Sequence, residues 1–141
     1  MQTRTLPRGL RNNNPLNIRI SATNWRGKMV PSQDKAFEQF RDIYFGIRAG
    51  LCIIRTYINK YRLTTVAQVI ARWAPDCEND TSAYVRTVLN RANISPVERL
   101  QFNNKNQMCR LCWAMALVEC GQQFKDTELR FSLFERAYEM V

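Results

Sequence analysis

The stretch Asn104–Gly121, which reads NKNQMCRLCWAMALVECG, decides the fold because most of its positions after the first turn are apolar. At about 100° per residue, Met108, Cys112 and Met115 fall on one side of a helix, and other apolar residues cover the remaining sides. A helix that is apolar on nearly every side is buried at the centre of a fold. We therefore expect a central helix over about 104–120 that stops at Gly121.

Glu119 lies in the middle of the apolar stripe of this helix. Desolvation raises the pKa of a carboxyl group, and a half-buried Glu at a helix end beside a cleft is suited to act as a general acid. The alternative is an ion pair with one of the many arginines, in which Glu119 only holds the end of the chain in place. Spacing alone leaves both interpretations open.

Beyond the N-terminal third of the chain, apolar residues recur at three- and four-residue steps, which predicts helices. Thr64 or Thr65 is the expected N-cap of a helix that Pro75 ends. Asn79 or Asp80 is the expected N-cap of the next one. We expect about five helices in all, which start near residues 44, 66, 81, 104 and 126, the last of them extending to 140.

Residues 16–20 and 36–40 alternate apolar and polar side chains, as short strands do. Turn residues at 24–27 and 31–32 lie between them, so we expect a small β-hairpin near the N-terminus. No internal repeat or Gly/Ser-rich linker divides the chain. The expected fold class is thus α+β, mostly α, as one domain over residues 1–141, with 1–9 as a loose arm.

The chain is strongly basic, with 21 Lys and Arg against 12 Asp and Glu and a net charge of +9. Such an excess attracts polyanions, which include nucleic acid, an anionic membrane surface and the bacterial cell wall. The positive charge is spread over the whole chain, and the aromatic residues do not alternate with basic ones as stacking platforms for nucleic acid do. We therefore do not expect nucleic acid as the main partner.

Other counts exclude several classes of protein. The chain has no histidine, which excludes a histidine general base and histidine zinc sites. No apolar run approaches the roughly 20 residues of a membrane span, and residues 1–14 lack the apolar core of a signal peptide. We expect synthesis in the bacterial cytoplasm without a signal peptide.

The five cysteines suggest reduced thiols, since their number is odd. Cys109 and Cys112 have the spacing of a redox or zinc pair, but no second pair accompanies them and they lie in the apolar helix. Small buried apolar residues are the better interpretation. We expect Cys109, Cys112 and Cys120 to be free and buried, with no metal and no cofactor.

Residues 8–19, RGLRNNNPLNIR, resemble the opening RGxRNNNPGNIR of a family of small phage and prophage proteins, which are described as phage structural or lysozyme-like proteins. The likeness continues in order through most of the chain, as far as residues 119–121. It implies a lysozyme-like domain of phage or prophage origin. One departure is Leu16, where the family commonly has Gly, which puts a loop conformation with positive φ in doubt.

A weaker resemblance, to the flagellum-associated glucosaminidases that cut peptidoglycan, rests on shorter motifs. Residues 13–18, 25–27 and 37–40 are similar to a hairpin of those enzymes, and NDTSAY at 79–84 is similar to a later segment. Their catalytic Glu ends a helix that precedes the hairpin, whereas the similar segment here, WAMALVECG, lies at 113–121. A circular permutation would explain this order, and the helix end would then face the 12–18 loop across a groove, with Tyr84 beside it.

The two resemblances imply which residues form a sugar-cleaving site. Glu119 would protonate the glycosidic oxygen, and a second carboxylate would activate water or stabilise the oxocarbenium ion. Asp34 in the hairpin and Glu78 in the loop before a helix are the candidates, although a solvated turn residue and a capping residue are the simpler interpretations. The candidates for sugar binding are Asn13, Asn14, Asn17, Trp25 and Tyr84.

The expected function is therefore that of a peptidoglycan-degrading glycosidase, a hydrolase or lytic transglycosylase of the muramidase or glucosaminidase kind. Its expected partners are cell-wall peptidoglycan and other phage proteins, and its expected place is the virion or the cell wall. Two alternatives stay open: a non-catalytic virion structural or assembly protein, and a basic nucleic-acid-binding module.

Overall fold

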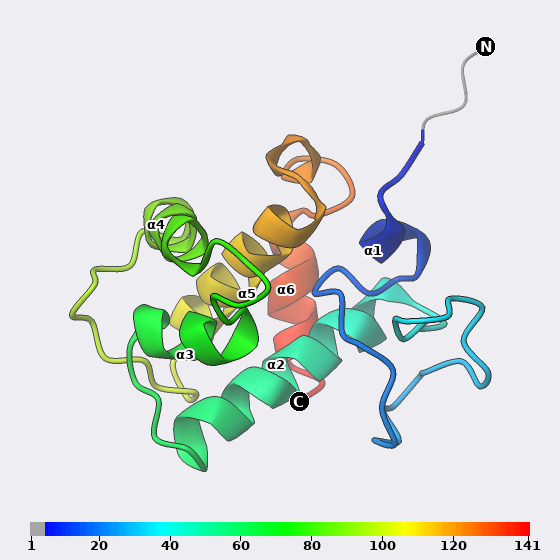
Figure 1. Cartoon of the computed structure of the whole chain (residues 1–141), viewed down its shortest axis with the longest axis horizontal. Coiled ribbons are helices and arrows are strands. Elements are labelled where there is room, and N and C mark those ends of the chain that lie inside the picture. Colours follow the sequence, from blue (N-terminus) through cyan, green and yellow to red (C-terminus); the bar gives the residue numbers. More distant parts are fainter. Residues whose placement is uncertain (1–4) are drawn as a thin grey trace.

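Helix α5 (Lys105–Cys120) lies at the centre of the molecule, packed between α4 and α6 (Figure 1). The computed structural model describes residues 5–141. Most of α5 is buried, as its apolar sides predict. Its N-cap is Asn104, whose side chain accepts a hydrogen bond from the Gln107 N–H at 3.1 Å. It ends at Gly121, whose φ of 131° favours glycine.

The remaining helices surround α5, and two of the expected N-caps are confirmed. Thr65 forms a capping box with Gln68, and Asp80 accepts a hydrogen bond from the Ala83 N–H at 3.1 Å. The elements are α1 (Arg8–Arg11), α2 (Ile43–Asn59), α3 (Val66–Trp73), α4 (Thr81–Ala92), the 3-10 helix η1 (Gln122–Phe124) and α6 (Phe131–Tyr138).

The predicted β-hairpin is wrong, and with it the α+β class, whereas the mostly α content is confirmed. Within residues 5–141, which the structure describes, no segment forms a β-strand. Residues 16–20 and 36–40 do lie side by side, because the Glu38 N–H donates to Ile18 O at 2.9 Å. In this described range the contacts amount to two isolated bridges, Arg19–Phe37 and Lys28–Phe40.

The side chain of Asn14 explains why no ladder forms in this segment. Its fully buried amide donates to Ile18 O at 3.0 Å and to Glu38 O at 2.9 Å, and its oxygen accepts from the Ile18 N–H at 3.0 Å. Two of these bonds occupy the Ile18 N–H and Glu38 O, which a regular antiparallel pair would join to each other. The segment is consequently an irregular loop built around one amide.

Two glycines of α2 allow the N-terminal loop to lie directly on this helix. A Cβ atom at Gly46 would lie 2.0 Å from the backbone oxygen of Asn13, and one at Gly50 would lie 2.8 Å from Cγ of Leu16. Leu16 is buried, and positive φ occurs at its neighbour Asn17 instead. The Leu in place of the family's Gly therefore does not disturb the loop.

Two boundaries differ from the sequence-based expectation. Helix α6 begins only at Phe131, because residues 125–129 form a turn in which the Leu129 N–H donates to Phe124 O at 2.8 Å. At the other end, Arg8 and Gly9 of the expected arm begin α1, and Gly9 is buried. Residues 1–4 of that arm lie outside the described residues.

Candidate functional site

The carboxyl group of Glu119 is held by two side chains from other parts of the fold. The Tyr84 hydroxyl of α4 donates to Glu119 Oε2 at 2.8 Å, and Asn17 Nδ2 of the N-terminal loop donates to Glu119 Oε1 at 3.1 Å. The helix end thus meets Tyr84 as predicted, but it contacts the 12–18 loop directly instead of facing it across a groove. In the described part of the chain, Glu119 makes no ion pair with an arginine.

Local structure explains why these three side chains meet. Tyr84 lies on the side of α4 that packs on α5, and its ring is buried there. Asn17 has a φ of 52°, a left-handed conformation that asparagine tolerates better than most residues. This turn brings the Asn17 amide to the end of α5, where the Cys120 thiol also donates to Pro15 O.

The Tyr84 hydroxyl remains a hydrogen-bond donor across the physiological pH range. Burial, and then the negative charge and hydrogen bond of Glu119, raise the pKa of Tyr84 well above its ordinary value of about 10. Burial and the same carboxylate raise the pKa of Cys120 to about 12. Both groups are therefore neutral beside Glu119.

A groove of about 370 Å³ opens in front of Glu119. One wall comes from the N-terminal segment with Asn17, Arg19 and Phe37, and the other from α2, α3 and the loop before α4. The second wall carries Tyr57, Trp73, Glu78 and Asn79. The groove therefore combines two carboxyl groups with amide and aromatic side chains.

Glu78 shares this groove with Glu119, whereas Asp34 does not line it. Asp34 accepts two hydrogen bonds from Arg8, at 2.6 and 2.7 Å, and one from Asn12 at 3.0 Å. The Arg8 guanidinium, together with the backbone N–H groups of Ala36 and Phe37, holds the pKa of Asp34 well below its usual range. Asp34 thus links α1, through Arg8, to the loop that contains Ala36 and Phe37.

The other predicted sugar-binding residues have internal contacts. Asn14 is fully buried, and Asn13 Nδ2 donates to Phe40 O at 3.1 Å. Trp25 is half-buried and does not line the groove. Tyr84 is buried and donates its hydroxyl hydrogen bond to Glu119, so its ring is not available for stacking on a sugar. Only Asn17 of that set lies in the groove.

Sequence reasoning missed several groove residues. Arg19, Tyr57 and Trp73 were not among the candidates. Trp73 is half-buried and packs edge-on against Tyr57, with 6.4 Å between the ring centroids. Tyr57 and Trp73 each fall at an apolar position of a predicted helix. Such a position is equally typical of a residue at the edge of the core and of one in the wall of a groove, so the sequence alone could not distinguish the two.

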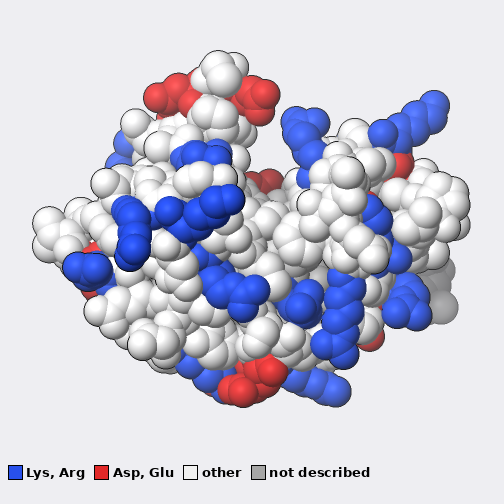
Figure 2. Space-filling model, turned by 90° about the horizontal axis from the view of Figure 1, so that it is seen from below, with Lys and Arg blue, Asp and Glu red and all other residues white. Residues whose placement is uncertain are grey.

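The cysteines are free thiols. Cys109, Cys112 and Cys120 are buried, as predicted, while Cys77 is exposed. Among residues 5–141, no cluster of His, Cys, Asp or Glu could hold a metal ion, and no helix has the length and apolarity to cross a membrane. Lys and Arg side chains are spread across the face in Figure 2 rather than gathered in one patch.

Comparison with known proteins supports a phage origin. Over 96 residues the chain is 46% identical to Protein P5 of Pseudoalteromonas phage PM2, an alignment that takes in 66% of this chain and 60% of that protein. A bacteriophage protein is thus a homologue of this chain. The chain spans less than two thirds of the phage protein's length, and no protein-family model matches it. The phage origin implied by residues 8–19 is supported, whereas the sugar-cleaving role remains a prediction.

Proposed function

We propose that the chain is a phage-derived glycosidase that cleaves the glycan strands of peptidoglycan, with Glu119 as the general acid. The observation that carries this proposal is the setting of Glu119: a carboxyl group at a helix end, oriented by Tyr84 and Asn17, and open to a groove. A structural ion pair would have left the carboxyl group against a cation instead.

The chemistry needs two carboxyl groups on opposite sides of the scissile bond. As the general acid, Glu119 donates a proton to the glycosidic oxygen as the bond to the anomeric carbon breaks. Glu78 then stabilises the positive charge that develops on the sugar ring, or takes a proton from the attacking water. Asp34 is not assigned this role, because it does not line the groove and is ion-paired with Arg8.

The groove also offers groups that recognise amino sugars. Trp73 and Tyr57 supply apolar faces for pyranose rings, and the side chains of Asn17 and Asn79 supply amides for acetamido groups. Arg19 is a cation suited to the carboxylates of muramic acid and its peptide.

The second candidate function is that of a non-catalytic virion component. It is favoured by the similarity to a phage protein. In this case the groove would bind its partner in the particle without cleaving it. The two candidates differ in one measurable property, the release of soluble sugar from purified cell walls.

The decisive experiment compares Glu119→Gln and Glu78→Gln with the wild type in a zymogram and a wall-clearing assay. We expect the Glu119 variant to lose about 10²–10⁴-fold in rate, the usual contribution of acid–base catalysis, with little change in melting temperature. Glu135→Gln, a change on the exposed side of α6, is the control and should retain full activity. Wild-type protein that clears no wall preparation would favour the virion component.

A further inference from the structure

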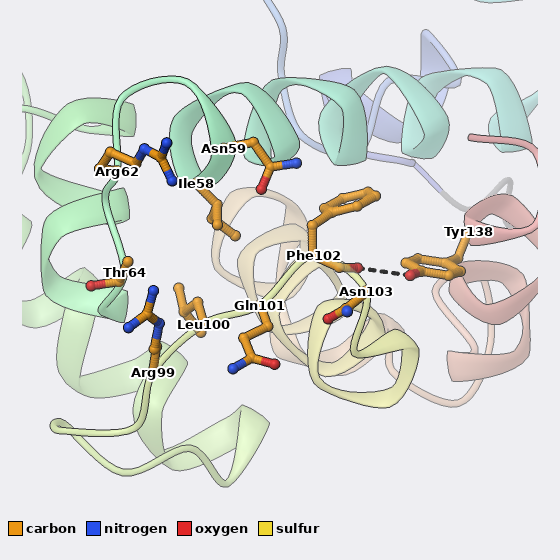
Figure 3. A pocket seen from close by; sticks show the side chains of 10 residues that line it. All are labelled: Ile58, Asn59, Arg62, Thr64, Arg99, Leu100, Gln101, Phe102, Asn103 and Tyr138. Carbon is orange, nitrogen blue, oxygen red and sulfur yellow. Dashed lines mark hydrogen bonds between the residues drawn. The ribbon is translucent and has the colours of Figure 1, made fainter.

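A second cavity, of about 520 Å³, lies at the C-terminal end of α2 and shares no lining residue with the groove of Glu119. Its walls come from four parts of the chain: the end of α2, the loop that follows α2, the segment that precedes α5, and helix α6 (Figure 3). Ile58 and Leu100 are buried in its floor. No role in sugar cleavage accounts for this cavity.

Two arginines give the cavity its charge. The guanidinium groups of Arg62 and Arg99 lie on the same side of it, with Thr64 between them (Figure 3). Neither guanidinium has a hydrogen bond or ion pair within residues 5–141, and none of the ten described lining residues is Asp or Glu. The cavity is thus lined by two solvent-exposed positive charges, and none of its described lining residues supplies a counter-charge.

The nearest acidic residues along the chain are directed elsewhere. Glu98 accepts a hydrogen bond from Gln107 Nε2 at 2.8 Å, and Glu139 is paired with Lys105. Both carboxylates therefore have partners of their own.

Three of the neutral lining side chains are solvent-exposed amides, each of which can donate hydrogen bonds through its NH2 group. The amides of Asn59, Gln101 and Asn103 make no hydrogen bond among the described residues. The two aromatic side chains are already occupied, since the Tyr138 hydroxyl donates to Phe102 O at 2.7 Å and their rings stack with centroids 5.5 Å apart. The cavity is therefore suited to oxygen atoms of an anion rather than to a stacked base.

The backbone of Arg62 has a conformation that is unusual for a residue with a long side chain. Arg62 follows α2 with a φ of 58°, in the left-handed conformation that closes the helix, and the Leu63 N–H donates to Tyr57 O at 3.0 Å. Glycine is the usual residue there because it has no Cβ. This chain instead has a long cationic side chain at the position, and that side chain lines the cavity.

We infer that this cavity binds a phosphate monoester of a small molecule. A phosphate monoester carries close to two negative charges at neutral pH and three acceptor oxygens, which match two guanidinium groups and their neighbouring amides. The cavity volume is that of a small-ligand site. This inference is independent of the proposed sugar cleavage.

The charge of the ligand provides the first test. The second pKa of a phosphate monoester is about 6, so about a tenth of it is dianionic at pH 5 and nearly all of it at pH 7.5. The chain has no histidine, the two arginines stay charged, and burial raises the pKa of Tyr138, so the lining groups do not titrate in this range. Calorimetric affinity for glycerol 3-phosphate should therefore rise about tenfold between these pH values.

Two other ligands distinguish the source of the phosphate. Inorganic sulfate is a dianion at both pH values, so its affinity should not change. Dimethyl phosphate, a diester with one charge, stands for a nucleic-acid backbone or a lipid headgroup and should bind at least tenfold more weakly than the monoester. Equal affinities for monoester and diester would overturn the assignment.

Variants give the second test. Arg62→Gly and Arg99→Gln should each weaken glycerol 3-phosphate binding at least tenfold, while Lys35→Gln, which removes an exposed charge elsewhere, should stay within twofold. Arg62→Gly should keep or raise the melting temperature, because glycine suits this backbone. A folded Arg62→Gly protein with unchanged affinity would refute the inference.

Discussion

At the scale of single residues, Tyr84 is the main support of Glu119. Its buried hydroxyl donates to the carboxyl group at 2.8 Å, and leaving a buried polar group without its hydrogen-bond partner costs about 1–3 kcal/mol. We predict that Tyr84→Phe lowers the free energy of unfolding by about 1–3 kcal/mol in urea titrations and slows wall cleavage. Tyr44→Phe, which removes only an exposed hydroxyl that accepts from Arg136, is the matched control and should change stability by less than about 0.5 kcal/mol.

Asp34 provides a prediction about acid. Its pKa in the folded protein is lowered by Arg8 and by backbone N–H groups, so its stabilising contribution is present above the unfolded pKa of about 3.9 and is lost as the pH falls below it. Asp34→Asn should thus be less stable than the wild type at neutral pH, and the difference should shrink below about pH 4. Thermal melts over this range measure it, with Asp76→Asn, on an exposed loop, as the control. A constant difference would contradict the ion pair with Arg8.

At the scale of elements, the contact between α2 and the N-terminal loop depends on Gly46. An alanine there would place its Cβ 2.0 Å from a backbone oxygen of Asn13, and the loop would have to move away. We predict that Gly46→Ala costs more than about 2 kcal/mol, despite the gain of about 1 kcal/mol in helix propensity. Gly50→Ala, which meets the Leu16 side chain rather than backbone, should cost less in the same urea titration.

The helices could be predicted from the sequence because their signals are local. The apolar period of α5 and the caps Thr65 and Asp80 involve neighbours along the chain. The hairpin prediction failed because the Asn14 amide takes backbone partners from residues up to 24 positions away. No local pattern shows where a buried amide will direct its hydrogen bonds.

The site was predictable to the same extent. The position of Glu119 on an apolar helix could be read from spacing, and its meeting with Tyr84 followed from the resemblance. The pairing of Asp34 with Arg8, 26 positions earlier, could not, since an acidic turn residue looks alike with or without a cation beside it. The contributions of Arg19 and Tyr57 to the groove depend on how the two walls face each other.

At the scale of the whole molecule, the net charge of +9 predicts how binding to cell walls depends on salt. The cations are spread over the surface shown in Figure 2, and exposed charges are screened beyond about 8 Å at 0.15 M salt. Pull-down on purified murein should therefore weaken steadily as salt rises from about 0.05 to 0.5 M. Binding that stays constant over this range would mean that contacts with sugar, rather than charge, hold the protein on the wall.

The hydrogen bond between Asn17 and Glu119 joins residues 102 positions apart. During translation, the carboxyl group therefore gains this partner only after the chain from residue 17 to residue 119 has left the ribosome. In the folded protein, transient detachment of residues 12–40 from α2 would separate Asn17 from Glu119 while α2–α6 stay folded, since segments of a protein open with different free energies. The lifetime of the hydrogen bond between Asn17 and Glu119 then depends on how long the N-terminal segment stays docked on α2. Hydrogen exchange at Asn17 and Ile18 would report that lifetime.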